Sequence, residues 1–462
     1  MADILLTHGY FLQEDEKEQQ IMRPYPPLGL LCLSAYLQRA GFSVDVHDTT
    51  LSTRADLAGR LQRGTGTLGI YTNLMTRRSV LDIVAHARRH GWTVVLGGPE
   101  SANYPEEYLA HGAHVVVFGE GEEALAELLP ALRDRGPHAL HAVPGIAFLD
   151  EHGRVVRAAD RAQIADIDAL PWPDRSRVDV NAYLDLWRSR HGMGSVNLIT
   201  ARGCPYRCTW CSHAVFGYSH RRRSPADCAE ELLHIRDTWQ PEMVWYADDV
   251  FTINHPWLFR YREELRARGL RVPFETITRA DRMLKEEVLE TLAEMGCFRI
   301  WIGSESGSRR VLEAMQRGVT PEQVQWACHA ARRHGIQVGM FLMWGYEGEA
   351  LGDIEATIDH VKRAAPDIFL TTVAYPIKNT AYFERVADRV EAARPWAEST
   401  DRDYVIRGRP SRDYYRHADQ WLRNAVAAHQ LEESDPQAAA RHRADARQAR
   451  EALVASAGEV AA

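Results

Sequence analysis

Short apolar runs alternate with helix-forming segments along most of this chain, and the alternation limits it to an α/β fold. In residues 1–150 strands are expected at residues 3–7, 42–47, 68–71, 93–96 and 114–118. Helices expected over residues 28–40 and 79–90 fall between successive strands. Strands separated by helices of this length predict a doubly wound, Rossmann-like parallel sheet.

A second alternation begins near residue 195 and continues to about residue 400. Its strands are expected at residues 196–200, 243–246, 274–281 (including the exit from the strand), 297–302, 337–344 and 368–375. Six strand–helix units predict a partial (β/α)6 barrel that is open on one side. Residues 151–194 are expected to form a linker, because the run Leu170-Pro171-Trp172-Pro173-Asp174 discourages regular structure. Residues 401–462 are expected to be a helical region with a frayed or disordered end.

The composition is that of a folded protein with a sizeable core. Hydrophobic residues make up 45% and charged residues 26% of the sequence, both ordinary for a globular chain. The net charge of -8 gives no electrostatic reason to expect nucleic acid or an anionic membrane as a partner. No apolar run approaches the ~18–20 residues that a membrane span needs, and no secretory signal pattern is present. We therefore expect a cytoplasmic protein.

Seven cysteines are an odd number for a disulfide framework. Four of them are scattered and are expected to be buried thiols: Cys32, Cys228, Cys297 and Cys328. The other three form a C-x3-C-x2-C run directly after the strand expected at residues 196–200: Cys204, Cys208 and Cys211. The run therefore lies at the carboxyl end of a barrel strand, where α/β barrels concentrate their active sites.

The compact cysteine run is suited to three corners of a [4Fe–4S] cube. Such clusters normally use four cysteines, so a trio leaves one iron open to a small-molecule ligand. A zinc knuckle is an alternative, because His213 could supply the fourth ligand that zinc requires. Reduced structural thiols are a second alternative.

With Trp210 just before its third cysteine, the run resembles the signature of the radical S-adenosylmethionine (SAM) superfamily. The resemblance implies that Cys204, Cys208 and Cys211 bind a [4Fe–4S] cluster whose open iron chelates the amino and carboxylate groups of SAM. The reduced cluster then cleaves SAM to a 5′-deoxyadenosyl radical. An external electron donor such as flavodoxin or ferredoxin is implied as a partner.

The resemblance also implies SAM contacts at the barrel strand ends. They are Trp210, Asp248, Asp249, Thr278, Arg279, Ser304, Glu305 and Gly345. A carboxylate suits the SAM ammonium group, and Asp248 is slightly favoured because Asp249 could instead cap a turn. Arg279 suits a carboxylate, although a salt bridge at the strand end would explain it equally well. The run Arg221-Arg222-Arg223 is interpreted as a solvated or structural patch in preference to an anion site.

Three segments of the first 150 residues look like the cobalamin-binding domain that precedes many radical SAM domains. They are Pro26-Pro27-Leu28-Gly29-Leu30, Gly97-Gly98-Pro99-Glu100 and Gly119-Glu120-Gly121-Glu122. The resemblance implies cobalamin contacts at Gly97, Gly98, Pro99, Gly119, Glu120 and Gly121. The D-x-H-x-x-G motif that supplies a lower cobalt ligand in other cobalamin proteins is absent, and Asp45-Val46-His47 is only a fragment at another strand. The alternative is a degenerate Rossmann-like domain whose glycines only form tight turns.

Together these features resemble cobalamin-dependent radical SAM enzymes, and they imply methylation of an unactivated carbon in a small-molecule or natural-product substrate. An oxidative cyclase is an alternative, because Tyr25–Leu30 and Met343–Glu349 look like segments of the anaerobic magnesium-protoporphyrin monomethyl ester cyclases. A methylthiotransferase would need three more cysteines in the first domain, which has only Cys32. A non-catalytic corrinoid or iron–sulfur carrier would not need the acidic strand ends. The sequence singles out no catalytic residue beyond the cofactor contacts.

Overall fold

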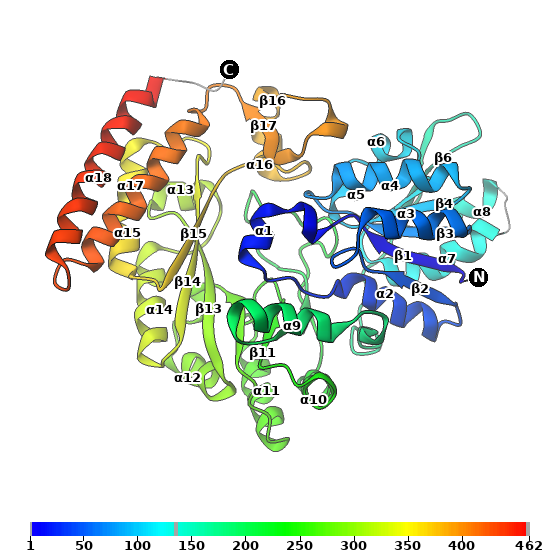
Figure 1. Cartoon of the computed structure of the whole chain (residues 1–462), viewed down its shortest axis with the longest axis horizontal. Coiled ribbons are helices and arrows are strands. Elements are labelled where there is room, and N and C mark those ends of the chain that lie inside the picture. The colour runs from blue at the N-terminus through cyan, green and yellow to red at the C-terminus, as the bar shows by residue number, and fades with distance from the viewer. Residues whose placement is uncertain (1, 134–136, 459–462) are drawn as a thin grey trace. The chain divides into compact units, whose positions relative to one another are not determined.

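The computed structural model describes residues 2–133 and 137–458 (Figure 1). The chain divides into two compact units. The first comprises residues 1–205, 212–248 and 394–400, and the second comprises residues 206–211, 249–393 and 401–462. The division falls within the cysteine run and within the barrel sequence. The domain boundaries at residues 150, 194 and 400 stay a prediction.

The first unit is built on a seven-stranded sheet with the order β2-β1-β3-β4-β5-β6-β7. Its strands are β1 (Ile4–His8), β2 (Val44–His47), β3 (Thr67–Tyr71), β4 (Thr93–Gly97), β5 (Val115–Val117), β6 (Ile146–Leu149) and β7 (Val155–Arg157). The first five pair in parallel, and β6 and β7 extend the sheet with antiparallel pairings. In the register of the central strands, Ile4 lies opposite both Val44 and Thr67.

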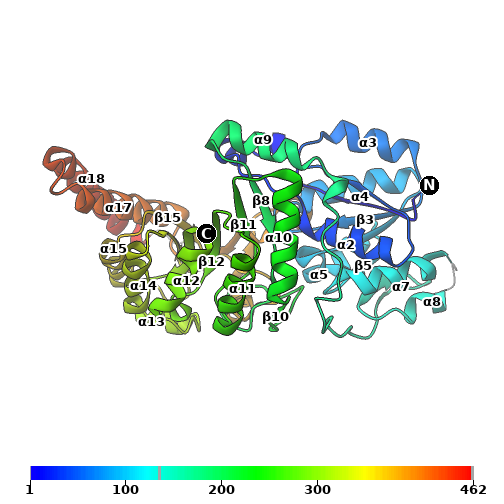
Figure 2. The same cartoon turned by 90° about the horizontal axis from the view of Figure 1, so that it is seen from below.

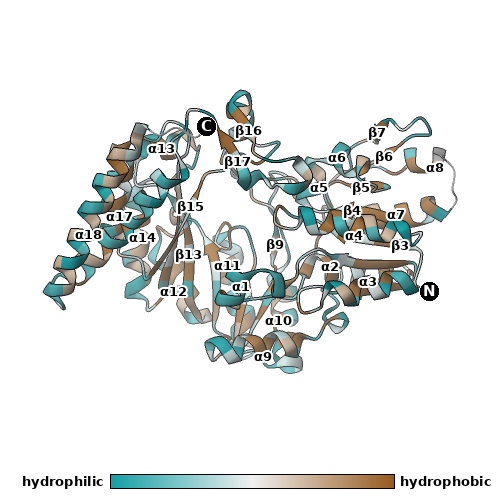
Figure 3. Cartoon of the chain, turned by 45° about the horizontal axis from the view of Figure 1, so that its top comes forward, coloured by the Kyte–Doolittle hydropathy of each residue, from teal (hydrophilic) through white to brown (hydrophobic). Residues whose placement is uncertain are grey.

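Helices cover both faces of this sheet, which confirms the doubly wound arrangement. They are α1 (Glu16–Ile21), α2 (Leu28–Arg39), α3 (Arg54–Arg63), α4 (Arg77–Arg89), α5 (Pro99–Asn103), α6 (Pro105–Ala110), α7 (Gly121–Arg133) and α8 (Pro137–His141). Successive β1 residues point to opposite faces, so Leu5 packs with α3 and α4 while Leu6 packs with α2 and α7. Apolar residues accordingly concentrate in the strands, with polar residues on the outer faces of the helices (Figure 3).

The predicted linker contains regular structure that the sequence did not indicate. Besides β7, it holds α9 (Val180–His191), a helix that begins at an Asp179 cap and ends at Gly192, whose φ is +74°. The indole of Trp187, buried on this helix, donates a hydrogen bond to the Pro24 carbonyl at 2.7 Å. Because the helix packs its apolar side on the first unit, it is part of that unit's fold.

The second sheet has six strands in the order β15-β14-β13-β12-β11-β8. Their bounds are β8 (Ser195–Leu198), β11 (Met243–Tyr246), β12 (Phe274–Thr278), β13 (Cys297–Glu305), β14 (Gln337–Trp344) and β15 (Ile368–Val373). Strands β8 and β11 pair in parallel in the first unit, and β12 to β15 pair in parallel in the second. Spatial order follows chain order, and β8 and β15 are the two edges. The predicted partial barrel is confirmed.

The connecting helices of this sheet follow the strands in turn. They are α10 (Pro225–Trp239), α11 (His255–Ala267), α12 (Glu286–Met295), α13 (Arg309–Ala314), α14 (Pro321–Arg333) and α15 (Leu351–Ala364). Smaller elements are the hairpin strands β9 (Ala201–Arg202) and β10 (Arg221–Arg222), the helix α16 (Ala381–Val386), and the paired strands β16 (Val390–Ala392) and β17 (Tyr404–Ile406). Within the described residues, no helix combines the length and apolar character that a bilayer crossing needs.

Two long helices end the described chain, α17 (Arg412–Gln430) and α18 (Pro436–Ala455), and they lie side by side (Figures 1 and 2). The inner face of α17 is buried, at Tyr414, Tyr415, Ala418, Leu422 and Ala425. The sequence predicted a helical region with a frayed or disordered end. Its helical character is confirmed by the 20-residue α18, in which a stripe of alanines and Leu453 packs inward. Residues 459–462 of that prediction lie outside the described residues.

Residues 394–400 return to the first unit after the barrel has been completed. The Trp396 ring packs on Tyr104, Tyr108 and His111 at centroid distances of 5.6, 4.9 and 5.4 Å. The buried Arg77 guanidinium lies over the same ring at 4.8 Å and donates to the Ser399 carbonyl at 2.9 Å. This segment, which we call the Trp396 segment, is therefore anchored in an aromatic site on α4–α6.

Candidate cofactor sites

The three clustered cysteines follow β9 on a loop with a constrained start. Gly203 has φ of +84°, and a Cβ there would lie 2.4 Å from the Ser219 carbonyl oxygen. Cys208 is buried, Cys204 and Cys211 are half-buried, and none of the three is in a disulfide. In the part of the chain that the structure describes, no three His, Cys, Asp or Glu side chains are grouped as a preformed metal site. The assignment of the three cysteines as cluster ligands therefore stays a prediction from their spacing.

The surroundings of Cys208 fit a metal-bound thiolate. Its Sγ lies 3.7 Å from Arg317 Nη1 and 4.0 Å from Arg279 Nη1, and both arginines are buried. Two buried guanidinium groups at this distance would offset the negative charge of a metal-bound sulfur. Sequence reasoning missed Arg317, because it lies 109 residues from Cys208 and outside any motif.

Arg279, one of the predicted SAM contacts, is held by several partners. Its Nε donates to Asp281 at 2.9 Å, and its Nη2 donates to the Arg317 carbonyl at 2.7 Å. The guanidinium also lies 3.6 Å from the centroid of the Tyr206 ring. The structure thus places Arg279 beside the cysteine loop, and a direct contact with SAM stays a prediction.

The Asp248 carboxylate, also a predicted SAM contact, is fully used inside the first unit. It accepts hydrogen bonds from Thr200 N at 2.6 Å, Thr200 Oγ1 at 2.5 Å, Ala201 N at 3.2 Å and Arg222 Nη2 at 3.0 Å. Four donors fill the acceptor capacity of a carboxylate. Asp248 therefore fixes the segment between β8 and the cysteine run. Asp249 is exposed, and a contact of either carboxylate with SAM stays a prediction.

Two further predicted SAM contacts, Thr278 and Ser304, are buried polar groups at strand ends. The Thr278 and Thr252 hydroxyls are hydrogen-bonded to each other. Ser304 Oγ lies 2.9 Å from His360 Nε2, and burial lowers the pKa of that histidine to about 4. Both hydroxyls have partners within the second unit, and their contact with SAM stays a prediction.

Glu305 ends β13 in the left-handed region, with φ of +64°. A non-glycine residue held there is strained and is typical of functional positions. Burial raises the pKa of its carboxyl, although Oε1 lies 3.7 Å from Arg317 Nε. A buried, strained carboxyl is suited to accept hydrogen bonds from a ligand such as SAM.

Gly345 and Trp210 complete the predicted SAM set. Gly345 has φ of +72°, and its amide donates to Glu349 Oε2 at 2.6 Å. Burial raises the pKa of Glu349 to about 8. The Trp210 ring packs against a group of buried hydrophobic side chains that includes Tyr346. The buried Nε1 of Trp210 has no hydrogen-bond partner among the described residues.

At the carboxyl edge of the first sheet, two consecutive residues are glycines and carry no side chain. Gly98 has φ of +105°, and a Cβ there would lie 2.3 Å from the Thr72 carbonyl oxygen. A Cβ on Gly97 would meet no atom within 4 Å, so this position opens into free space. Tyr71 and Met75, which follow on β3 and its loop, are 37% and 56% exposed. An open edge bordered by exposed apolar side chains fits the flat, largely apolar ring of cobalamin.

Other predicted cobalamin contacts have structural partners. The buried Glu120 carboxylate accepts from Arg202 at 2.7 Å, Arg221 at 2.5 Å and the Ile164 amide at 2.9 Å. Gly121 begins α7, and a Cβ there would lie 3.0 Å from Leu33 of α2. Glu120, in the loop after β5, is thus paired with Arg202, which directly precedes Gly203. Only its backbone is left for a contact with cobalamin.

Gly119 and Pro99 are the remaining two predicted cobalamin contacts. Gly119 has φ of +70°, and a Cβ there would lie 3.6 Å from the Val215 carbonyl oxygen. Pro99 occupies the first turn of α5, where its missing amide is tolerated. Both residues shape turns at the carboxyl edge, and their contact with cobalamin stays a prediction.

The three consecutive arginines are also structural. Arg221 pairs with Glu120, Arg222 with Asp248, and Arg223 with the buried Glu231. This agrees with the interpretation favoured from the sequence.

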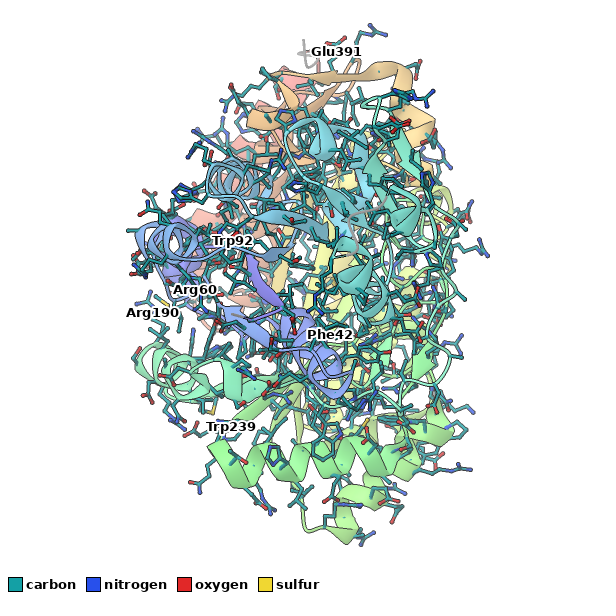
Figure 4. All side chains as sticks on the ribbon, turned by 90° about the vertical axis from the view of Figure 1, so that its right-hand side faces the viewer. Phe42, Arg60, Trp92, Arg190, Trp239 and Glu391 are labelled. Carbon is teal, nitrogen blue, oxygen red and sulfur yellow. The ribbon has the colours of Figure 1, made fainter. Side chains whose placement is uncertain are left out.

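The Asp45-Val46-His47 fragment lies on β2, the edge strand, which β1 and β3 separate from β4 and its glycines. Asp45 pairs with Arg60 of α3, and burial lowers the pKa of His47. Both residues line a pocket of about 630 Å³ together with Arg60 and Trp92, which Figure 4 labels.

Two family models match this chain. The radical SAM superfamily model matches residues 198–361, and the B12 binding domain model matches residues 21–129. The chain is a radical SAM protein with a B12-binding domain. This radical SAM protein is 27% identical over 392 residues to an uncharacterized methyltransferase from Pyrococcus horikoshii, covering 83% of each chain. It is 25% identical over 383 residues to the anaerobic magnesium-protoporphyrin IX monomethyl ester cyclase of Rubrivivax gelatinosus, covering 80% of this chain and 68% of the cyclase.

Solved structures share the fold of this radical SAM protein. The cobalamin-dependent SAM radical enzyme OxsB with bound aqua-cobalamin superposes with a TM-score of 0.76 at 17% identity, covering 98% of this chain and 71% of OxsB. The radical SAM domain implies a [4Fe–4S] cluster and SAM, and the B12 domain implies cobalamin. The cationic surroundings of Cys208 fit the cluster, and the glycine edge fits the corrinoid. The protein is therefore a cobalamin-binding radical SAM enzyme.

Proposed function

We propose that this enzyme is a cobalamin-dependent methyltransferase that methylates an unactivated carbon of a small-molecule substrate. The observation that carries the proposal is the presence, in one chain, of an open glycine edge in a B12 domain and a cysteine loop whose Cys208 faces two buried arginines. The Pyrococcus horikoshii relative, named a methyltransferase, supports the same reaction class.

The residues divide the work between the two cofactors. When bound, the cluster supplies the electron that cleaves SAM, and cobalamin supplies the methyl group. Cys204, Cys208 and Cys211 would hold the cluster through three thiolates. Glu305 would accept hydrogen bonds from SAM, and Gly97 and Gly98 would let the sheet edge approach the corrin ring.

An oxidative cyclisation is the second candidate. It is favoured by the similarity to the Rubrivivax gelatinosus cyclase, which extends over 80% of this chain. The two reactions differ in how they consume SAM. A methyltransferase of this kind uses one SAM for 5′-deoxyadenosine and another for S-adenosylhomocysteine, whereas a cyclase forms no S-adenosylhomocysteine.

The test uses the full chain purified without oxygen from cobalamin-fed cells. We expect about four irons, as for one [4Fe–4S] cluster, and cobalamin in the same preparation. With a reductant and SAM carrying a deuterated methyl group, we expect 5′-deoxyadenosine, S-adenosylhomocysteine and labelled methylcobalamin. Formation of 5′-deoxyadenosine alone would favour the cyclase, and absence of all three products would contradict both candidates.

A matched pair of cysteine variants locates the chemistry. Cys208→Ala should lose the cluster and 5′-deoxyadenosine formation. Cys328→Ala, which removes a buried thiol of α14, should retain both. Equal iron content in the two variants would contradict the ligand role of Cys208.

A further inference from the structure

A strained turn after α13 directs Arg317 inward. Gln316 and Gly318, on either side of it, both have left-handed backbones, with φ of +52° and +65°. The Arg317 amide donates to the Leu312 carbonyl at 2.9 Å, which closes the turn on the helix. The arginine side chain is consequently buried, and the whole residue is 7% exposed. Strain of this kind persists only where the surrounding structure holds it.

The same turn holds the backbone of the cysteine loop. The Met315 carbonyl accepts hydrogen bonds from Thr209 N at 3.0 Å and from Thr209 Oγ1 at 3.2 Å. Thr209 directly follows Cys208. The turn therefore fixes both the backbone beside Cys208 and the guanidinium that approaches its sulfur.

Each side of the Arg317 guanidinium has a defined neighbour. Nη1 lies 3.7 Å from Cys208 Sγ, and Nη2 donates to the Gly303 carbonyl at 2.7 Å. Nε lies 3.7 Å from Glu305 Oε1. A Cβ on Gly303 would lie 2.6 Å from Nη2, so the glycine makes room for the arginine. The geometry selects a planar, forked cation at this position.

Arg279 reinforces the arrangement. Its Nη2 donates to the Arg317 carbonyl while its Nη1 lies 4.0 Å from the same sulfur. Asp281 and the Tyr206 ring hold the Arg279 guanidinium in place. Two buried guanidinium groups thus converge on Cys208, the middle cysteine of the three.

We propose that Arg317 is a positioning residue that raises the reduction potential of the cluster through the sulfur of Cys208. The inference rests on the three cysteines binding that cluster. Reduction adds one electron to a cluster that already carries three thiolates, so a nearby buried cation stabilises the reduced form more than the oxidised form. Hydrogen bonds to ligand sulfurs act in the same direction. Arg317 therefore eases the electron transfer that must precede SAM cleavage.

The experiment measures the midpoint potential of the anaerobically loaded enzyme by EPR-monitored redox titration, together with iron per chain. Arg317→Gln should keep the iron and lower the potential by at least a tenfold change in the reduction equilibrium, about 59 mV for one electron. Arg317→Lys retains the charge and should lower the potential less. Arg309→Gln, at an exposed arginine that starts α13, should leave it unchanged.

Each outcome decides the inference. A fully loaded Arg317→Gln enzyme with the wild-type potential would overturn it while leaving the proposed function intact. If folded Arg317→Gln loses the cluster but Arg317→Lys retains it at a lowered potential, the charge acts on the cluster as proposed. Loss from both folded variants would overturn it, since a retained charge should preserve the cluster. A wild-type enzyme that binds no iron would remove the proposed function and this inference together.

Discussion

The glycine edge of the first sheet is open space, whereas the charged groups around the barrel strand ends are buried and paired. The glycine edge is open because Gly97 and Gly98 lack side chains. The strand ends instead bury charged groups such as Asp248 and Arg317, each surrounded by partners. Added bulk should therefore damage the first region, and removed charge should damage the second. Substitutions that reverse this pattern would show that the distinction is wrong.

The largest loss in the free energy of unfolding is expected where a substitution leaves a buried charge without its partner. Asp248→Ala removes the acceptor for Arg222, Thr200 and Ala201 and leaves the Arg222 guanidinium buried beside an empty position. Breaking a buried pair from one side costs about 3–5 kcal/mol, measured as the free energy of unfolding in urea. Asp237→Ala, in an exposed pair on α10, should cost no more than about 1 kcal/mol. Equal losses in the two variants would contradict the prediction.

At the glycine edge, Gly98→Ala should be the most damaging small substitution. Its Cβ would meet the Thr72 carbonyl oxygen at 2.3 Å, and alanine disfavours φ of +105°. We expect a loss of about 2–3 kcal/mol in the free energy of unfolding, since strained backbone alone costs about 1–3 kcal/mol. The neighbouring Gly97→Ala should change stability by less than about 0.5 kcal/mol. Comparable stability of the two variants would mean that the turn can relax.

Glu349 predicts a pH dependence of stability in the second unit. Burial raises its pKa from 4.5 to about 8, so the folded state binds the proton more tightly than the unfolded state between these values. This contribution to stability is complete below pH 4.5 and is lost as pH rises through about 8. Glu349→Gln should remove this pH dependence of the free energy of unfolding. The stability of the variant relative to wild type should therefore increase from pH 5 to pH 8.5.

Urea unfolding of wild type and Glu349→Gln across this pH range measures the effect. Glu384→Gln, on the exposed side of α16, controls for the substitution itself. An advantage of Glu349→Gln that is constant with pH would mean that the carboxyl is already ionised in the fold.

The smallest expected change in stability comes with a loss of binding. Gly97→Leu would place a side chain in the open space at the end of β4, so we expect at least a tenfold weaker affinity for cobalamin with little change in the free energy of unfolding. Absorbance titration with hydroxocobalamin measures the affinity. Gly352→Leu on α15, where a Cβ also meets no atom within 4 Å, is the matched control. Unchanged affinity in Gly97→Leu would move the corrinoid away from this edge.

The strand pattern was predictable because short apolar runs, and the glycines that end them, can be recognised from neighbouring residues alone. The strands expected at residues 243–246 and 337–344 match β11 and β14 in both bounds. The linker helix α9 was missed because the Pro-rich run before it dominates the local pattern, while its stability comes from packing of Trp187 against residues near Pro24.

The site was predictable only where its chemistry lies in consecutive residues. The three cysteines are such a case, since their spacing within one loop identifies them. Arg317 is the opposite case, because its proximity to Cys208 depends on a turn closed 109 residues away. For Asp248 and Glu120 the residue type was informative, but the donors that occupy their carboxylates come from segments that only the fold brings near.

The Trp396 segment has a consequence for how the protein is made. The buried guanidinium of Arg77 donates a hydrogen bond to the carbonyl of Ser399, which is synthesised 322 residues later. At translation rates of about 5–20 residues per second, the aromatic site on α4–α6 stays unfilled for roughly 15–60 s while the barrel is synthesised. The first domain therefore leaves the ribosome before Trp396 can cover Tyr104 and Tyr108, and its aromatic site is completed only after the barrel strands have been made.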